Sequence, residues 1–92
     1  MEIIWTSEAK KTFKQNVNYL KKEWPLKVVE GFVDSAYDAI SKIQVHPKIG
    51  RYDKVWDCYK LIVVKQITLY YQIDKNKIVL ISFWNNYQKP KE

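Results

Sequence analysis

The chain of 92 residues contains a single cysteine, only two glycines and three prolines. One cysteine excludes an internal disulfide and favours a reducing compartment, so we expect a cytoplasmic protein. The scarcity of glycine and proline, with 47% hydrophobic and 15% aromatic residues, indicates a globular domain rather than a disordered chain. No apolar run approaches the roughly 20 residues that span a bilayer, and the first residues do not resemble a signal peptide. We therefore expect one domain, residues 1–92, with no membrane partner.

The chain also lacks the motifs of several common sites. It has no glycine-rich phosphate loop, no serine nucleophile motif and no Cys/His cluster for zinc. Its one histidine, His46, precedes a proline after a predicted helix, so we interpret it as a loop or capping residue rather than a general base. Cys58 lies on a predicted strand and is interpreted as a small buried hydrophobe. We therefore expect neither a metal nor a cofactor.

Positive charge is plentiful and unevenly distributed. The formal net charge is +6. Residues 1–47 have seven lysines against six acidic residues, whereas residues 48–92 have nine Lys or Arg against four acidic residues. A field of this sign favours an anionic partner, either nucleic acid or an acidic protein. A basic surface that serves only solubility would give the same count.

The first half of the chain predicts a strand and two helices. Residues 2–5 are apolar and rich in Ile, which favours a strand. Thr6 is a good helix N-cap, and the apolar residues that follow recur at spacings of three and four. Pro25 ends this helix and suits the first turn of a second helix over residues 26–43. The short connection predicts an antiparallel helical hairpin, and Gly31 is expected to allow the helices to approach closely.

The second half predicts three strands. A loop is expected over residues 44–53, followed by strands over 56–63, 66–73 and 78–83. We expect residues 84–92 to form a flexible tail. In the middle strand the alternation places Ile67, Leu69, Tyr71 and Ile73 inward and Gln66, Thr68, Tyr70 and Gln72 outward.

Together these elements predict an α+β domain in the order β-α-α-β-β-β. An N-terminal strand joins a small, mostly antiparallel sheet, and the antiparallel helical hairpin packs on one face of that sheet. The other face stays available for a partner.

A group of cations is predicted near this open face. Its members are Arg51, Lys54, Lys60, Lys65 and Lys89, with Tyr70, Tyr87 and Trp84 nearby. Tyr59 and Tyr71 are expected in the core, and Trp5, Trp24 and Trp56 are expected to serve packing.

This group of residues suits metal-free RNA cleavage. In that reaction the ribose 2′-OH attacks the adjacent phosphate, fixed cations stabilise the developing charge, and a side chain moves a proton. Exposed aromatic rings would stack on unpaired bases. An acidic helical partner would use the same surface.

The whole chain resembles the RelE/ParE superfamily of toxins from bacterial type II toxin–antitoxin systems, some of which act in plasmid stabilization. Four blocks carry the resemblance, in order: Pro47-x-Ile49-Gly50-Arg51, Asp57-Cys58-Tyr59-Lys60, Tyr70-Tyr71-Gln72-Ile73, and the ending from Ile81 to Pro90. That ending is similar to the Phe-x-Asp-x-Arg-Gln-x-Pro tail of some members. The resemblance implies a small α+β domain with an antiparallel sheet against a helical hairpin.

RelE-like members are metal-independent endoribonucleases that cleave mRNA, typically on the ribosome. Lys60 matches the first of their lysines, but Ile62 stands where they repeat a lysine, Thr68 where they place an arginine, and Tyr87 where tail-bearing relatives have an arginine. Lys60 is therefore a catalytic candidate, with Arg51 and Tyr87 as partial substitutes for the missing cations. Lys54, Lys65, Thr68, Tyr70 and Lys89 are candidates for binding nucleic acid or a partner.

ParE-like members lack these ribonuclease residues and poison DNA gyrase, so the depleted cationic set leaves both activities open. In either case the resemblance implies a cognate antitoxin, acidic and partly disordered when free, that folds over the basic sheet face. The alternative is a degenerate, non-catalytic member that acts as a protein- or nucleic-acid-binding module.

Overall fold

The computed structural model describes residues 1–87. Its elements are β1 (Glu2–Trp5), α1 (Ser7–Glu23), α2 (Leu26–Val45), β2 (Arg51–Asp53), β3 (Cys58–Val64), β4 (Ile67–Asp74) and β5 (Lys77–Asn85). The expected α+β order is confirmed, with one additional short strand, β2, inside the predicted loop. Within residues 1–87 no helix is long and apolar enough to cross a membrane.

The helix boundaries follow from local capping chemistry. Thr6 is the N-cap of α1, and its hydroxyl accepts from the N–H of Ala9 at 3.0 Å. The same hydroxyl donates to the carbonyl of Leu80 at 2.7 Å, which attaches the start of α1 to β5. Pro25 occupies the N-cap position of α2, and His46 is its C-cap, with its N–H bonded to the carbonyl of Lys42. The interpretation of His46 as a capping residue is confirmed.

The strands form one sheet in the order β1-β5-β4-β3-β2. β1 pairs with β5 in parallel, and the other pairs are antiparallel. β3 begins at Cys58, two residues later than expected, because residues 54–57 form a turn in which Asp57 has a positive φ of 51°. β5 continues to Asn85, beyond the predicted end at residue 83.

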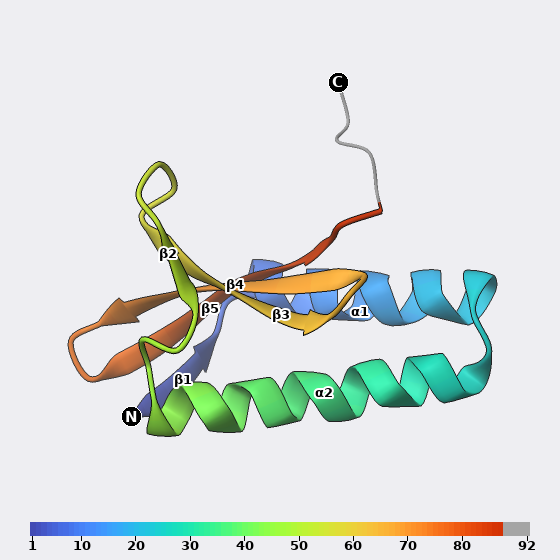
Figure 1. Cartoon of the computed structure of the whole chain (residues 1–92), viewed down its shortest axis with the longest axis horizontal. Coiled ribbons are helices and arrows are strands. Elements are labelled where there is room, and N and C mark those ends of the chain that lie inside the picture. The colour runs from blue at the N-terminus through green and yellow to red at the C-terminus, as the bar shows by residue number, and fades with distance from the viewer. Residues whose placement is uncertain (88–92) are drawn as a thin grey trace.

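The core lies between the helical hairpin and one face of the sheet. Figure 1 shows α1 and α2 running antiparallel, and the turn between β2 and β3 projecting on the side away from α2. Fully buried side chains on the sheet include Ile67, Leu69 and Tyr71 of β4, as the alternation predicted. They meet helix residues that include Leu20, Phe32, Ala36 and Ile43.

Three expectations about packing were wrong. A Cβ added to Gly31 would meet no atom within 4 Å, so this glycine does not mediate close helix approach. Trp56, expected to pack, is 71% exposed because it lies in the turn before β3 rather than in the strand. The sequence alternation predicted that Gln66 and Thr68 would face outward, yet both residues are buried. For Thr68 the cause is the residues after β5, which bond to it and to its neighbours.

Candidate functional site

Three of the predicted site residues lie in one row across the open face of the sheet. Arg51 on β2 is paired with Lys60 on β3, and Lys60 is paired with Tyr70 on β4. Directly opposite residues in antiparallel strands point to the same face, about 5 Å apart. Their sequence neighbours Tyr59 and Tyr71 pack toward the helices, so this row faces away from them.

The next row on the same face carries no charge. Ile62 is paired with Thr68, and Thr68 is paired with Trp84. Ile62 stands where the resemblance implies a lysine in RelE-like ribonucleases, and Thr68 stands where it implies an arginine. Apolar and aromatic groups therefore stand beside Lys60 in place of additional cations.

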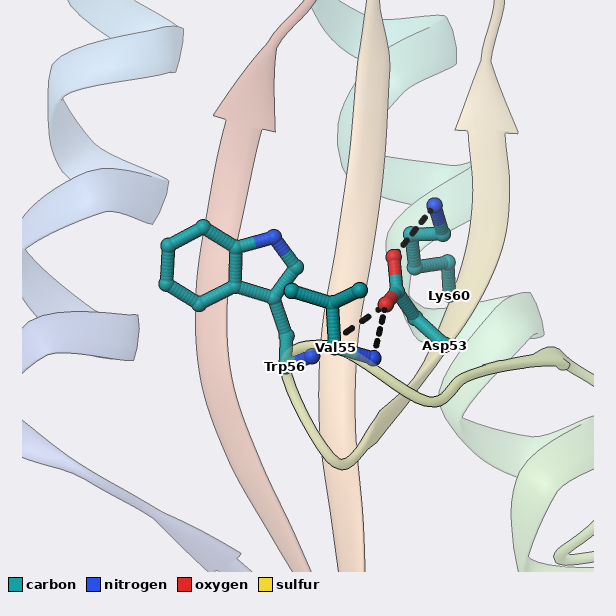
Figure 2. Close-up of polar contacts among 4 residues, drawn as sticks. All are labelled: Asp53, Val55, Trp56 and Lys60. Atoms are coloured by element: carbon teal, nitrogen blue, oxygen red, sulfur yellow. Dashed lines mark hydrogen bonds and ion pairs between the residues drawn. The ribbon is translucent and has the colours of Figure 1, made fainter.

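Lys60 is held by Asp53, a residue absent from the predicted site. Its ammonium Nζ lies 3.0 Å from Oδ2 of Asp53. The other carboxylate oxygen of Asp53 accepts from the backbone N–H groups of Val55 at 2.9 Å and Trp56 at 3.2 Å (Figure 2). One carboxylate thus fixes both the lysine and the turn between β2 and β3. The sequence does carry a signal for the role of Asp53 in the turn, which is its position just before residues 54–57. Asp side chains commonly accept from backbone N–H groups two or three residues further along the chain.

This pairing sets the protonation of both groups. The hydrogen bond from Lys60 holds the pKa of the Asp53 carboxyl below its usual value, and the same bond raises the pKa of Lys60. Lys60 therefore stays protonated at neutral pH and is unsuited to act as a general base. Its charge is also partly neutralised by its partner.

The Pro47-x-Ile49-Gly50-Arg51 block has a structural role. The hydroxyl of Tyr71 donates to the carbonyl of Pro47 at 2.7 Å and accepts from the N–H of Gly50 at 3.0 Å. A Cβ on Gly50 would lie 2.7 Å from that hydroxyl oxygen and 2.9 Å from the carbonyl oxygen of Lys60. Position 50 therefore has no room for a side chain. The bond between the Gly50 N–H and Tyr71 places the next residue, Arg51, beside β3, where it pairs with Lys60.

The residues after β5 are bonded to the start of β4. Thr68 donates its hydroxyl to the side chain of Asn86 at 3.2 Å, and Asn86 donates to the carbonyl of Lys65 at 3.0 Å. The exposed Tyr87 follows, with its backbone N–H bonded to the side chain of Asn85. The hydroxyl of Thr68, a predicted binding residue, is therefore engaged within the chain.

The remaining predicted cations do not join this row. Lys54 lies in the turn before β3 and Lys65 in the turn after it. β3 has seven residues. At a rise of about 3.3 Å per residue the two lysines are separated by roughly 20 Å along the strand. Lys89 lies outside the described residues.

An apolar groove occupies the open face instead. It has a volume of about 470 Å³ and is lined by Trp56, Cys58, Tyr70, Ile81, Ser82 and Trp84. Cys58 is buried as expected, and burial raises the pKa of its thiol, which disfavours a nucleophilic role. Within residues 1–87 no three His, Cys, Asp or Glu side chains gather in a way that could hold a metal ion.

Comparisons with known proteins agree with the resemblance read from the sequence. Residues 3–88 match the family model described as the ParE toxin of the type II toxin–antitoxin system parDE. No curated protein sequence matches the chain. A solved structure described as a YoeB/ParE toxin from Agrobacterium tumefaciens has the same fold, with a TM-score of 0.69 and 13% identity over 95% of this chain and 100% of that one. The chain therefore belongs to the ParE toxin family of type II toxin–antitoxin systems, within the RelE/ParE superfamily.

Proposed function

We propose that this type II toxin inhibits growth by poisoning DNA gyrase rather than by cleaving mRNA. The observation that carries the proposal is the uncharged row formed by Ile62, Thr68 and Trp84 beside Lys60. Cleavage of RNA needs fixed cations around the developing phosphorane and a group that moves a proton. In the described part of the chain, Lys60 is paired with Asp53, and the adjacent row offers neither a cation nor a base.

Apolar side chains exposed on the open face support a protein target. Trp56, Ile62 and Trp84 expose apolar surface on the open face. Exposed apolar patches are typical of protein–protein interaction sites. Poisoning an enzyme by binding requires a docking surface and no catalytic group of the toxin's own.

A second candidate, mRNA cleavage, is favoured by the row of Arg51, Lys60 and Tyr70, with Tyr87 on the segment that follows β5. In this mechanism Arg51 and Lys60 would stabilise negative charge on the phosphate. If this mechanism operates, Lys60→Ala should abolish cleavage.

We also propose that a cognate antitoxin, acidic and partly disordered when free, neutralises the toxin in the cytoplasm. The excess of positive charge in residues 48–92 supports an acidic partner. A short gene for such a protein beside the toxin gene, whose product restores growth, is the expected finding.

The decisive experiment separates the two targets. Purified toxin is mixed with gyrase, relaxed plasmid and ATP, and in parallel with ribosomes translating a defined mRNA. We expect linear plasmid that depends on both gyrase and toxin, and intact mRNA. In cells induced to make the toxin alone, DNA synthesis should stop before protein synthesis, with an SOS response. Cleaved mRNA and an early stop in translation would establish the second candidate, and no effect on either process would indicate a non-catalytic binding module.

A further inference from the structure

The turn between β2 and β3 exposes two large apolar side chains. Val55 is 86% exposed and Trp56 is 71% exposed. Figure 1 shows this turn extending beyond the rest of the sheet. Trp56 also lines the groove on the open face, opposite residues of β4 and β5 that include Tyr70 and Trp84. We call this surface, formed by residues 54–57 and the groove, the turn–groove surface.

The turn is held in place from both ends. Asp53 accepts from the N–H groups of Val55 and Trp56 at its start (Figure 2). At its end, Asp57 accepts from the hydroxyl of Tyr52, and its carbonyl accepts from the side chain of Gln72 at 3.0 Å. A surface fixed before binding loses less conformational entropy when a partner docks. These bonds therefore fix the backbone from which the exposed indole of Trp56 projects.

The composition and charge of the surface indicate the kind of partner. Tryptophan and tyrosine are prominent among the residues that dominate the energetics of protein interfaces, and Trp56, Tyr70 and Trp84 line this groove. Lys54 is exposed in the turn, and Arg51 is exposed in the row that runs through Lys60 to Tyr70. The carboxylates of Asp53 and Asp57 are engaged by Lys60 and Tyr52. An apolar groove with these exposed basic residues fits an acidic protein segment that inserts an apolar side chain.

Other occupants fit less well. A second copy of the chain would bring two sets of these basic residues together, which is unfavourable. Nucleic acid binding depends on several cations that contact phosphates. Lys60, the cation on the strand beside the groove, is already paired with Asp53.

We propose that the turn–groove surface docks an acidic segment of a gyrase subunit, with Trp56 and Trp84 as its apolar anchors and Asp53 as the positioning residue of the turn. This inference rests on the proposed function, because it assigns the surface that recognises the proposed target.

The test measures the affinity of the full-length toxin for gyrase, together with toxin-dependent plasmid cleavage. Trp56→Ala and Trp84→Ala are each expected to weaken binding by about tenfold or more, as loss of an interface anchor does. Leu26→Ala is the matched control, because Leu26 is 65% exposed on α2, away from the sheet. It should bind as the wild type does.

Asp53 is tested through a pair of variants. Asp53→Asn keeps an oxygen that accepts from the turn but removes the charge that pairs with Lys60, whereas Asp53→Ala removes both. We expect the alanine variant to lose more affinity than the asparagine variant, with the two showing similar urea midpoints. A purely structural role would instead lower stability and affinity together.

The outcomes separate the two proposals. If wild-type toxin neither binds nor poisons gyrase, the proposed function fails and the docking assignment falls with it. If wild-type toxin poisons gyrase while Trp56→Ala and Trp84→Ala match it, only the docking assignment is overturned. A single-stranded oligonucleotide that competes with gyrase, and that Trp56→Ala no longer binds, would make the surface a nucleic-acid site and overturn the assignment as well.

Discussion

Replacing Gly50 with alanine is expected to destabilise the fold, whereas the same replacement at Gly31 is expected to stabilise it. An added Cβ at Gly50 would lie 2.7 Å from the hydroxyl oxygen of Tyr71 and 2.9 Å from the carbonyl oxygen of Lys60, closer than Cβ atoms approach other groups. Neither neighbour can yield easily. The carbonyl belongs to the backbone of β3, between β2 and β4, and the hydroxyl is fixed by its bond to Pro47.

The alanine must therefore displace the loop and break the bond between the Gly50 N–H and Tyr71. Overpacking costs about 1–3 kcal/mol, and a lost hydrogen bond costs about 1 kcal/mol. We expect the free energy of unfolding to fall by about 2–4 kcal/mol, which lowers the Tm by roughly 10–20 °C in a domain of this size. Gly31 lies inside α2 with no atom within 4 Å of the added Cβ. Alanine there should raise the free energy of unfolding by about 0.5–1 kcal/mol.

Equilibrium unfolding in urea, followed by tryptophan fluorescence, measures both changes. A double-mutant cycle with Tyr71→Phe locates the cause, because removing the hydroxyl relieves one of the two close contacts. Gly50→Ala should then cost less in the Tyr71→Phe background than in the wild type. A Gly50→Ala variant as stable as the wild type, or a shift of the two glycine variants in the same direction, would refute the steric role of Gly50.

Three further predictions concern the cap, the ion pair and the thiol. Thr6→Ala should lower the free energy of unfolding by about 1–2 kcal/mol, because it removes the N-cap bond to Ala9, and thermal unfolding of Thr6→Ser should show most of that stability restored. The lowered pKa of Asp53 means that its stabilising contribution is present above the ordinary value of 3.8 and is lost as the pH falls through the lowered pKa. The raised pKa of Lys60 means that the pair's contribution persists below the ordinary value of 10.5 and is lost as the pH rises through the raised pKa. The stability difference between the wild type and Asp53→Asn should therefore shrink in strong acid and strong base, and a difference that does not vary with pH would contradict the pairing. Cys58 should react with a thiol reagent much more slowly in the native protein than in urea, and equal rates would show that the thiol is accessible.

The sequence by itself determined the helices and the class of fold. Capping and apolar periodicity act between residues no more than about four positions apart, so they can be read along the chain. Thr6, Pro25 and His46 bound α1 and α2 as their local chemistry requires. The alternation in β4 likewise identified Leu69 and Tyr71 as core residues. The four blocks that resemble RelE/ParE toxins identified the superfamily, which the family match confirms.

Only the tertiary structure decided which candidate site residues meet. Cross-strand pairing placed Arg51, Lys60 and Tyr70 in one row, and the length of β3 separated Lys54 from Lys65. β2 was missed because three residues carry too little alternation to predict a strand. Pairing with β3 holds Arg51–Asp53 in the sheet, and the N–H of Gly50, just before the strand, is bonded to Tyr71, 21 positions away.

The same limit explains Trp56 and Asp53. A tryptophan at the start of a predicted strand was expected to be buried, but the bond of its N–H to Asp53 holds Trp56 in a turn that projects from the sheet. Whether a side chain enters the core or faces a partner depends on strand register and turn geometry. Both are set by contacts between residues far apart in the chain, which local patterns do not record.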